Sequence, residues 1–419
     1  MRSTVGVIVE YNPFHNGHAY HLKQSRLAAN ADTVVAVMSG NWLQRGEPAL
    51  LNKWARTESA LLAGVDLVIE LPVAYSTQPA EWFAFGAISA LDATGIVDTV
   101  CFGSESGDIA GLAALAEQLR SEPETFQDFL KSELKRGLPY PAAYAAAVEK
   151  LTKLPFAPSI AKPNNSLGFH YILALLRLNS RIRPLTIQRQ KAPYNESRLT
   201  DRSIASATAI RTRLLQASTA DSLASIAPYV PDTTFRIMER EARLGRSPVH
   251  WERYRGPLFH RLLMQSPRQL SAYREMTEGL EFRIKKSLLK LGNDPTVEGL
   301  LETMKTKRYT RTKLQRLLTA VYLEHAYADV NPGVLKQGVP YLRVLGFTPA
   351  GRELLRRMKE TAAVPVITEI GRDMHPWLAL DVKATGAYAL GYERATPDDW
   401  FADYYTPPVR TSFAGSAAK

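Results

Sequence analysis

The sequence predicts an α/β fold, with a parallel five-stranded sheet in the first half and a mainly helical, basic domain after it. Three observations lead to this prediction. Apolar runs alternate with helix-length segments in the first half, and basic residues are in excess in the second half. The chain has 419 residues, of which 45% are hydrophobic, and this exceeds what one compact core needs. We therefore place one domain at residues 1–215 and a second domain at residues 216–419.

Five short apolar runs in the first half predict buried strands. They span residues 5–9, 33–38, 66–71, 97–102 and 184–189. The segments between them are long enough for helices, which is the spacing that a parallel sheet requires. From about residue 108 to residue 160 the apolar spacing becomes helical, so we expect a helical insertion between the fourth and fifth strands.

Polar segments that contain glycine follow the first, second and fourth predicted strands. They span residues 15–18, 39–48 and 103–106. Ligands of a parallel sheet bind beyond the carboxyl ends of its strands, where these segments would meet. We therefore expect a binding site at this edge.

The segment after the first strand carries His15 and His18 at the start of a predicted helix. The free amide groups and the dipole of a helix start favour anions, and two imidazoles three positions apart can donate to the same phosphate chain. Gly17 between them lets the backbone approach a flat base closely. The pattern predicts ATP as the ligand. The simpler interpretation is that the two histidines only cap a helix.

Two later segments of the first half also suggest ligand contacts. Residues 163–168 begin a helical run, where Asn164 and Asn165 are either helix caps or binding residues. Residues 204–211 follow the fifth strand and open another helix, which carries Ser206, Thr208 and Arg211. We expect these three side chains to face the histidine segment across the triphosphate.

The net charge of +11 is concentrated in the second half. Residues 1–215 hold 22 basic and 19 acidic side chains, against 30 and 22 in the rest of the chain. Ten basic and three acidic side chains lie within residues 283–316, which makes this segment a candidate for binding a polyanion. Tyr309 lies inside it, and Trp251 and Tyr254 lie in another basic stretch. Aromatic side chains among cations favour RNA over DNA, although a basic run can also be a solvated helix face.

The single cysteine, Cys101, excludes an intramolecular disulfide and a multi-cysteine zinc site. It suits a reducing compartment, so we expect a cytoplasmic protein. No apolar run in the sequence reaches the length of a membrane span, and we expect no membrane partner.

Two of these segments resemble the signatures of the HIGH-type nucleotidyltransferases, a superfamily with a Rossmann-like sheet. Residues 15–18 resemble its H-x-G-H signature, and residues 206–211 resemble its S-S-x-x-I-R element. In the second element Ala207 replaces a serine, and Thr208 offers a substitute hydroxyl.

A longer series of segments resembles the bacterial tRNA(Met) cytidine acetate ligase family. The series comprises residues 9–18, 37–40, 43–49, 52–56, 102–105, 163–165, 206–211 and 305–311, and the resemblance extends to about residue 345. It implies that ATP and acetate form acetyl-adenylate and that the acetyl group passes to the wobble cytidine of elongator tRNA(Met). Mg²⁺ would accompany the triphosphate, although no carboxylate cluster in the sequence marks a metal site held by the protein.

The resemblance also implies the functional residues. The ATP site would comprise Ile8, Val9, Glu10, Tyr11, Asn12, Pro13, Phe14, His15, Asn16, Gly17, His18, Ala19, Tyr20, His21, Gly103, Asn164, Asn165 and Arg189. We assign catalytic roles to His15, His18, Ser206, Thr208 and Arg211, since charge develops on phosphoryl oxygens during adenylation. The tRNA-binding candidates are Lys305, Lys307, Arg308, Tyr309 and Arg311. Acetate needs a cation, for which Arg45, Lys53 and Arg56 are candidates, unless they lie on a helix surface.

Two other functions fit parts of the sequence. A metabolite adenylyltransferase would share the ATP site but would leave the basic second half without a role. A non-catalytic RNA-binding protein would explain the charge but not the two halves of an ATP site. Pyrophosphate exchange that requires acetate distinguishes the ligase from both.

Overall fold

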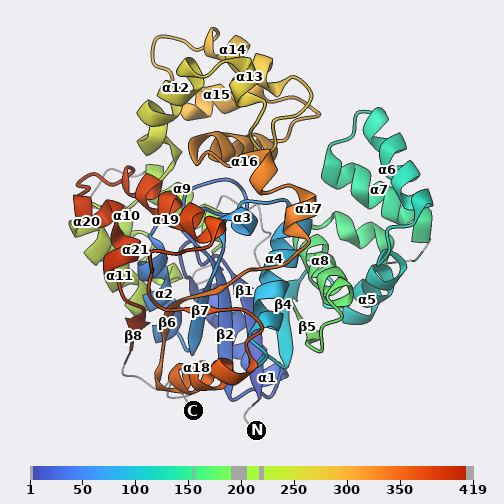
Figure 1. Cartoon of the computed structure of the whole chain (residues 1–419), viewed down its shortest axis with the longest axis vertical. Helices are drawn as coiled ribbons and strands as arrows, with labels where there is room; N and C mark the ends of the chain where they lie inside the picture. Colours follow the sequence, from blue (N-terminus) through green and yellow to red (C-terminus); the bar gives the residue numbers. More distant parts are fainter. Residues whose placement is uncertain (1–2, 153, 155, 190–204, 217–220, 412–419) are drawn as a thin grey trace.

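Eight strands form one central sheet in the computed structural model, which describes residues 3–152, 154, 156–189, 205–216 and 221–411 (Figure 1). The sheet order is β5-β4-β1-β2-β3-β6-β7, and β8 also pairs with β6. The strands are β1 (Thr4–Val9), β2 (Thr33–Ser39), β3 (Leu67–Leu71), β4 (Thr99–Ser104), β5 (Arg183–Gln188), β6 (Leu342–Phe347), β7 (Val366–Ile367) and β8 (Val409–Arg410).

The predicted fold class is confirmed, because β1 to β5 form the expected parallel sheet. The predicted number of strands is wrong. Three further strands come from the last part of the chain, and β6 runs antiparallel to β3, with Glu70 opposite Arg343. All five residues of β3 are buried, so an open edge here would expose an apolar strand with unpaired backbone groups. Strand β6 covers that edge.

Helices cover both faces of the sheet. Helices α1 (Asn16–Ala28) and α2 (Lys53–Leu62) pack on one face, and α4 (Ala80–Ala93), α8 (Pro163–Arg177) and α18 (Pro349–Thr361) pack on the other. The alternation along β2 explains this arrangement. Val34, Ala36 and Met38 face the first layer, whereas Val35 and Val37 face the second.

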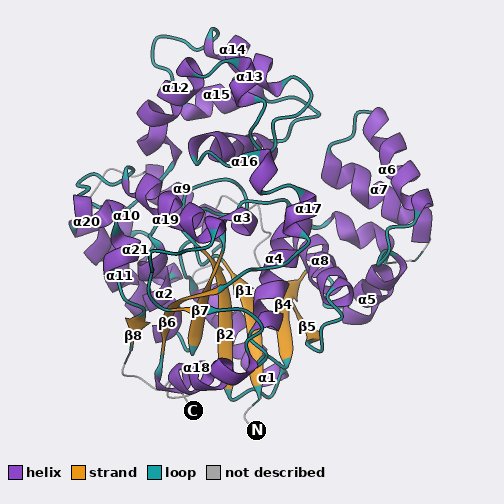
Figure 2. Cartoon of the chain, viewed as in Figure 1, coloured by secondary structure: helices purple, strands orange, loops and turns teal. Residues whose placement is uncertain are grey.

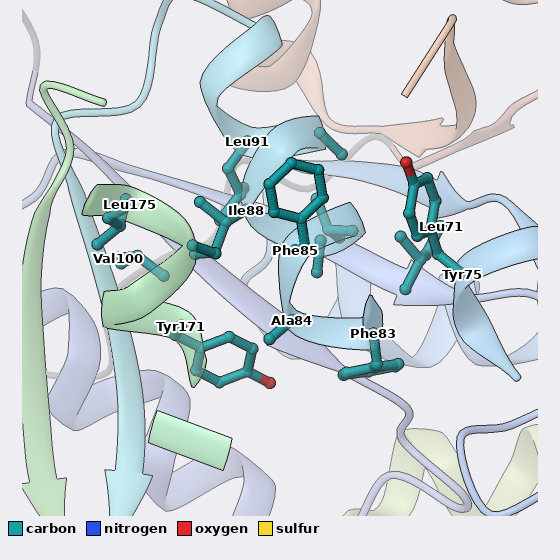
Figure 3. Packing of buried hydrophobic residues seen from close by; sticks show 14 of the residues in the cluster. Leu71, Tyr75, Phe83, Ala84, Phe85, Ile88, Leu91, Val100, Tyr171 and Leu175 are labelled. Carbon is teal, nitrogen blue, oxygen red and sulfur yellow. The ribbon is translucent and has the colours of Figure 1, made fainter. Parts of the chain in front are cut away.

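The larger core lies on the α4 face of the sheet (Figure 3). Phe83, Ala84, Ile88 and Leu91 of α4 are buried there, together with Tyr171 of α8. Helix α4 is apolar around most of its circumference because it lies between the sheet and α8.

Three helices and a short 3₁₀ turn lie between β4 and α8, where the sequence predicts an insertion. They are α5 (Ile109–Gln118), α6 (Glu124–Lys135), α7 (Tyr140–Thr152) and η1 (Ala157–Ala161). In Figure 1 α6 and α7 project away from the sheet on one side of the molecule.

The chain after residue 205 is mainly helical until it returns to the sheet at β6 (Figure 2). Its helices are α9 (Ala207–Gln216), α10 (Asp221–Ala224), α11 (Asp232–Arg243), α12 (Arg255–Met264), α13 (Pro267–Leu270), α14 (Leu280–Leu288), α15 (Val297–Met304), α16 (Arg311–Tyr322), α17 (Pro332–Leu335), α19 (Pro376–Ala389), α20 (Pro397–Trp400) and α21 (Ala402–Tyr405). The remaining short elements are α3 (Val73–Ser76), η2 (Ala227–Tyr229), η3 (Trp251–Tyr254) and η4 (Tyr327–Asp329). Because β6 to β8 follow residue 340, the sheet contains strands from both sides of the predicted boundary at residue 215, which stays a prediction.

Helices α12 to α16 pack around a second core, which Trp42 and Tyr388 also enter, and this core corrects one expectation. Trp251 and Tyr254, which were expected to be available to RNA bases, are buried in it with exposed fractions of 8% and 0%. Both rings pack against Trp42, which comes from the loop after β2. The sequence shows the charges beside these two aromatic residues along the chain, but not the aromatic partner more than 200 positions away. Among the described residues, no helix has the length and apolarity of a membrane-spanning segment.

Candidate active site

The two predicted histidines lie in the first turn of α1, directly after β1. His15 is the N-cap residue, and its extended backbone (φ −135°, ψ 172°) leads the chain into the helix. Its amide N–H donates to Nδ1 of His18 over 3.3 Å, and the two imidazole rings stack with their centroids 3.7 Å apart. The first turn of α1 contains no acidic residue. Backbone N–H groups and two imidazoles therefore meet in a turn that contributes no carboxylate of its own.

Aromatic side chains pack between this turn and the sheet. The rings of Tyr11 and Phe14 are buried in the core between α1 and the sheet, with their centroids 4.6 Å apart. The ring of His18 packs edge-on against Tyr11, at 5.0 Å. This packing restricts the imidazole to one orientation and so fixes the direction of its N–H groups.

The histidines of this turn are neutral at pH 7. Burial, together with the Arg189 and Arg211 guanidiniums, lowers the pKa of His15 to about 3. Burial and Arg189 lower the pKa of His21 to about 4, and burial lowers the pKa of His18 well below its usual value. A neutral imidazole still donates one N–H, so the site offers hydrogen bonds to an anion while Arg189 and Arg211 supply the positive charge.

Three buried polar atoms of the site have no hydrogen-bond partner within the described residues. They are Nδ2 of Asn12, Nδ1 of His15 and Nε2 of His21. A buried polar group without a partner is costly, which indicates that a ligand completes these bonds. The predicted ATP site therefore contains groups suited to a polar ligand.

The second predicted segment lies against the first. Arg211 of α9 donates from Nη1 to the backbone carbonyl of Asn12 over 2.9 Å. Its Nη2 lies 3.2 Å from Glu47 and 3.5 Å from the hydroxyl of Thr208. Ser206 precedes α9, and its Oγ accepts from the amide of Ala209 at 3.0 Å. Arg211 thus reaches the loop that leads into the histidine turn, Thr208 lies beside Arg211, and the Ser206 hydroxyl stabilises the start of α9.

The remaining ATP-site candidates lie at the ends of β4 and β5 and in the first turn of α8. A Cβ atom at Gly103 would lie 3.3 Å from the Arg189 side chain and 3.7 Å from that of His21, so these three positions adjoin. Oδ1 of Asn165 accepts from the amides of Glu105 and Ser106 at 2.9 and 3.1 Å.

The N-cap residue of α8 is Lys162, so neither asparagine has the expected capping position. The Glu105 carboxylate instead accepts from the amides of Asn164 and Asn165 at 3.1 and 2.7 Å. These contacts hold the loop after β4 against the start of α8.

Two candidates for the acetate cation are occupied inside the protein. Lys53 is fully buried, and its Nζ lies 2.9 Å from Glu70 and 2.8 Å from Asp403. Arg56 is also fully buried. Its guanidinium donates to the carbonyls of Glu10 at 2.7 Å, of Leu51 and Ser39 at 3.0 Å, and of Gly40. Neither residue lies on a helix surface. Arg56 holds the loops that follow β1 and β2, whereas Lys53 joins β3 to α21. Arg45, the third candidate, is half-buried in the loop after β2.

The sequence does not reveal the role of Arg56, because its partners are backbone carbonyls that no residue pattern marks. The available signal was an arginine beside Lys53 in a segment directly after the polar loop.

The predicted tRNA-binding run lies between the end of α15 and the first residue of α16. Acidic side chains pair with most of it: Arg308 with Glu278, Arg311 with Glu298, and Lys305 with Glu302 at 3.4 Å. The hydroxyl of Tyr309 donates to Glu278 at 3.0 Å. Lys307 is exposed and has no carboxylate partner within the described part of the chain.

The helical part contacts the active-site loop directly. Nε1 of Trp251 donates to the carbonyl of Gly46 at 2.9 Å. Gly46 has a φ of +69°, and a Cβ atom there would lie 2.2 Å from the backbone nitrogen of Arg316 in α16. The loop after β2 therefore connects the sheet to the helices above it.

Comparison with known proteins agrees with this arrangement. The family described as HIGH Nucleotidyl Transferase matches residues 1–400. A tRNA(Met) cytidine acetate ligase of Lysinibacillus sphaericus is 41% identical over 97% of this chain and 99% of its own length. The chain belongs to the tRNA(Met) cytidine acetate ligase family. Another member, from Acetivibrio thermocellus, is 40% identical over 93% of this chain and 95% of its own length.

Two solved structures have the same fold over nearly the whole chain. The crystal structure of Thermotoga maritima TmcAL bound with alpha-thio ATP matches with a TM-score of 0.88 at 35% identity. The apo form of that protein matches with a TM-score of 0.89. Both comparisons cover 98% of this chain and 100% of the Thermotoga chain.

Proposed function

We propose that this protein is an ATP-dependent ligase that acetylates the exocyclic amine of the wobble cytidine of elongator tRNA(Met). The names of relatives about 40% identical support the substrate. One structural observation supports the chemistry best: Arg211 of α9 reaches the Asn12 carbonyl at 2.9 Å and joins the two halves of the ATP site.

In the first step, a carboxylate oxygen of acetate attacks the α-phosphorus of ATP. The bond from that phosphorus to the bridging oxygen breaks, and pyrophosphate leaves. Negative charge grows on the phosphoryl oxygens and on the leaving group. We assign His15, His18, Thr208 and Arg211 to stabilise this charge, and Ser206 to hold α9 in place while its backbone faces the phosphates.

In the second step, the cytidine amine attacks the carbonyl carbon of acetyl-adenylate, and AMP leaves. The amine loses one proton to water. Because the mixed anhydride is already reactive, the protein mainly has to hold the two groups in contact. This requires the cytidine to leave the base stack of its loop.

The proposed ATP site comprises residues 8–21 with Gly103, Asn164, Asn165 and Arg189. The unpartnered atoms of Asn12, His15 and His21 support a polar ligand there. Mg²⁺ would travel with the triphosphate. Within the described residues no group of three or more His, Cys, Asp or Glu side chains is arranged to hold a metal, so we assign no protein ligand to it.

We further propose that residues 216–419 contribute most of the tRNA contacts, with Lys307 as an unpaired cation of the basic run. We place the reaction in the cytoplasm, which the single reduced thiol of Cys101 suits.

Pyrophosphate exchange into ATP tests the first step. We expect exchange that depends on acetate, followed by acetyl transfer when elongator tRNA(Met) is added. Exchange that requires a phosphorylated metabolite would favour an adenylyltransferase instead. The absence of exchange with every acid would favour a non-catalytic RNA-binding protein.

A further inference from the structure

Four aromatic side chains of the last described segment are exposed, and the proposed function so far gives them no role. Trp400, Phe401, Tyr404 and Tyr405 have exposed fractions of 40%, 50%, 48% and 68%. They lie on α20 and α21 and at Phe401 between them, and these two short helices lie beside α2 and α11 in Figure 1. Exposed aromatic residues this dense mark a binding surface more often than a solvated one.

A cavity of about 540 Å³ opens next to them, between α2, α11 and α21. Its volume lies in the usual range for small-ligand pockets. Its walls include the rings of Trp54, Tyr392 and Tyr405 and the guanidiniums of Arg240 and Arg246. We propose that this cavity binds an unpaired nucleotide of the RNA, adjacent in the strand to the cytidine that is acetylated. The inference rests on the proposed function.

Acidic partners already hold the guanidiniums of the pocket in place. Arg240 lies 2.8 Å from Glu58 and 2.9 Å from Glu241, and Arg246 lies 2.7 Å from Asp399. Both arginines remain partly exposed, at 42% and 34% of their side chains. A planar guanidinium fixed in this way presents a flat face on which a base stacks, as does the ring of Tyr405.

The same acidic side chains determine which part of a nucleotide enters. Glu58, Asp398 and Asp399 line the cavity and would repel a phosphate, whereas a carboxylate accepts well from the exocyclic amine of a base. The base therefore points inward. The phosphates lie outside, where Arg236 and Arg243 of α11 are exposed on the same helix face as Arg240.

One segment of three residues, 50–52, contacts both this cavity and the ATP site. The amide of Leu50 donates to Asn12 at 2.7 Å on one side, and the side chain of Asn52 donates to Glu241 at 3.2 Å on the other. One hydrophobic cluster also packs α9, which carries Arg211, against α2 and α11. An RNA strand that places the flipped cytidine in the ATP site therefore also passes the cavity. The nucleotide next to this cytidine is unpaired in the loop of the tRNA and can enter the cavity.

Affinity for RNA tests the inference with the full-length protein. The probes are an elongator tRNA(Met) transcript and two copies of it, each with an abasic residue on one side of the wobble cytidine. We expect Tyr405→Ala to weaken binding of the intact transcript by about tenfold, because one base stack is lost. Tyr405→Trp, which keeps an aromatic ring, should bind like the wild type. Acetate-dependent pyrophosphate exchange should be unchanged in both variants.

The abasic transcripts show which contact is lost. One of them should bind the wild type about tenfold more weakly and should bind Tyr405→Ala as the intact transcript does. Tyr327→Ala, which removes another exposed tyrosine in η4, is the matched control and should change nothing. Wild-type affinity in Tyr405→Ala, or an abasic penalty that persists in this variant, would overturn the inference. Failure of the wild type to acetylate the transcript would instead contradict the proposed function.

Discussion

At the scale of single residues, the site depends on imidazoles that are kept neutral. A charged histidine pair with its ring centroids 3.7 Å apart would repel itself, and both rings lie near Arg189. Neutral rings avoid this repulsion and still donate to phosphate oxygens.

If His18 donates to charge that grows in the transition state, His18→Ala should lower the rate of acetate-dependent exchange by about a hundredfold. The melting temperature should change little. His260→Ala, at an exposed position of α12, is the matched control. An unchanged exchange rate in folded His18→Ala protein would exclude this role.

Histidines that are buried and neutral make stability depend on pH. Burial lowers the pKa of His325 to about 3, and neither of its ring nitrogens has a hydrogen-bond partner among the described residues. The unfolded chain binds a proton near pH 6.5, whereas the folded protein binds it only near pH 3. Stability is therefore complete above pH 6.5 and is lost as the pH falls toward 3, by about 1.4 kcal/mol per pH unit for this residue.

Substitution of His325 by leucine removes the imidazole that binds this proton in the unfolded chain. As the pH falls from 6 to 4, the free energy of unfolding should then decrease less steeply than in the wild type, by about 1.4 kcal/mol per pH unit. Urea titrations at several pH values measure the slope. Parallel slopes in His325→Leu and wild type would show that His325 is protonated in the folded state.

At the scale of elements, the loop after β2 is held from three sides. The Arg56 side chain in α2 donates to its carbonyls, Trp251 of η3 donates to Gly46, and the backbone of α16 lies against Gly46. Glu10 at the end of β1 accepts from the amide of Gln44 in the same loop, at 2.8 Å. The ATP site and the helical part therefore share one segment.

Gly46→Ala should show how tightly this contact is packed. The new methyl group would combine a strained φ of +69° with an overlap against the α16 backbone, so we expect a loss of about 2–4 kcal/mol of stability. Gly64→Ala is the matched control, because Gly64 has a φ of +109° but open space around it. It should cost only the backbone strain, about 1 kcal/mol. Chemical denaturation of both variants provides the comparison, and equal losses would mean that the loop can move away from α16.

The basic run makes a different prediction for each of its cations. Replacement of Lys305, Lys307, Arg308 and Arg311 by alanine should weaken tRNA binding and spare acetate-dependent exchange. Lys307→Ala alone should reduce the salt dependence of binding by about one unit of slope. Arg308 and Arg311 should contribute less, because a phosphate has to displace Glu278 or Glu298.

Affinity measured at several salt concentrations tests this, with Lys336→Ala as an exposed lysine outside the run. If the quadruple variant and the wild type show the same slope, the run is a solvated face.

At the scale of the whole molecule, residues from both ends of the chain stabilise one sheet. Lys53 joins Glu70 of β3 to Asp403 of α21, and Arg343 of β6 lies 3.4 Å from the same Asp403. All four side chains are nearly inaccessible to solvent. Removal of one partner would leave a buried charge without compensation, so the network restricts how the last part of the chain can sit on the sheet.

The sequence contained the signals for β1 to β5 and for the histidine turn, because continuous apolar runs and a short motif are local features. It did not reveal β6, which carries Arg343 within a basic region. The charge of Arg343 becomes acceptable in a strand only beside Asp403, 60 positions later. Trp251 was misjudged for the same reason, since its partner Trp42 lies on another part of the chain. Contacts of this kind are set by tertiary packing and leave no periodic signal.

The pairing of β3 with β6 has a consequence for synthesis on the ribosome. The strand that precedes α3 emerges early, but the segment that covers its edge follows only when residues 342–347 have been translated. During that interval β3 is an apolar edge strand with unpaired backbone groups, and such an edge can pair with other chains. A nucleotide-binding half released at residue 215 would keep this exposed edge permanently. The first half of the chain is therefore protected from association with other chains only after β6 has been translated and has paired with β3.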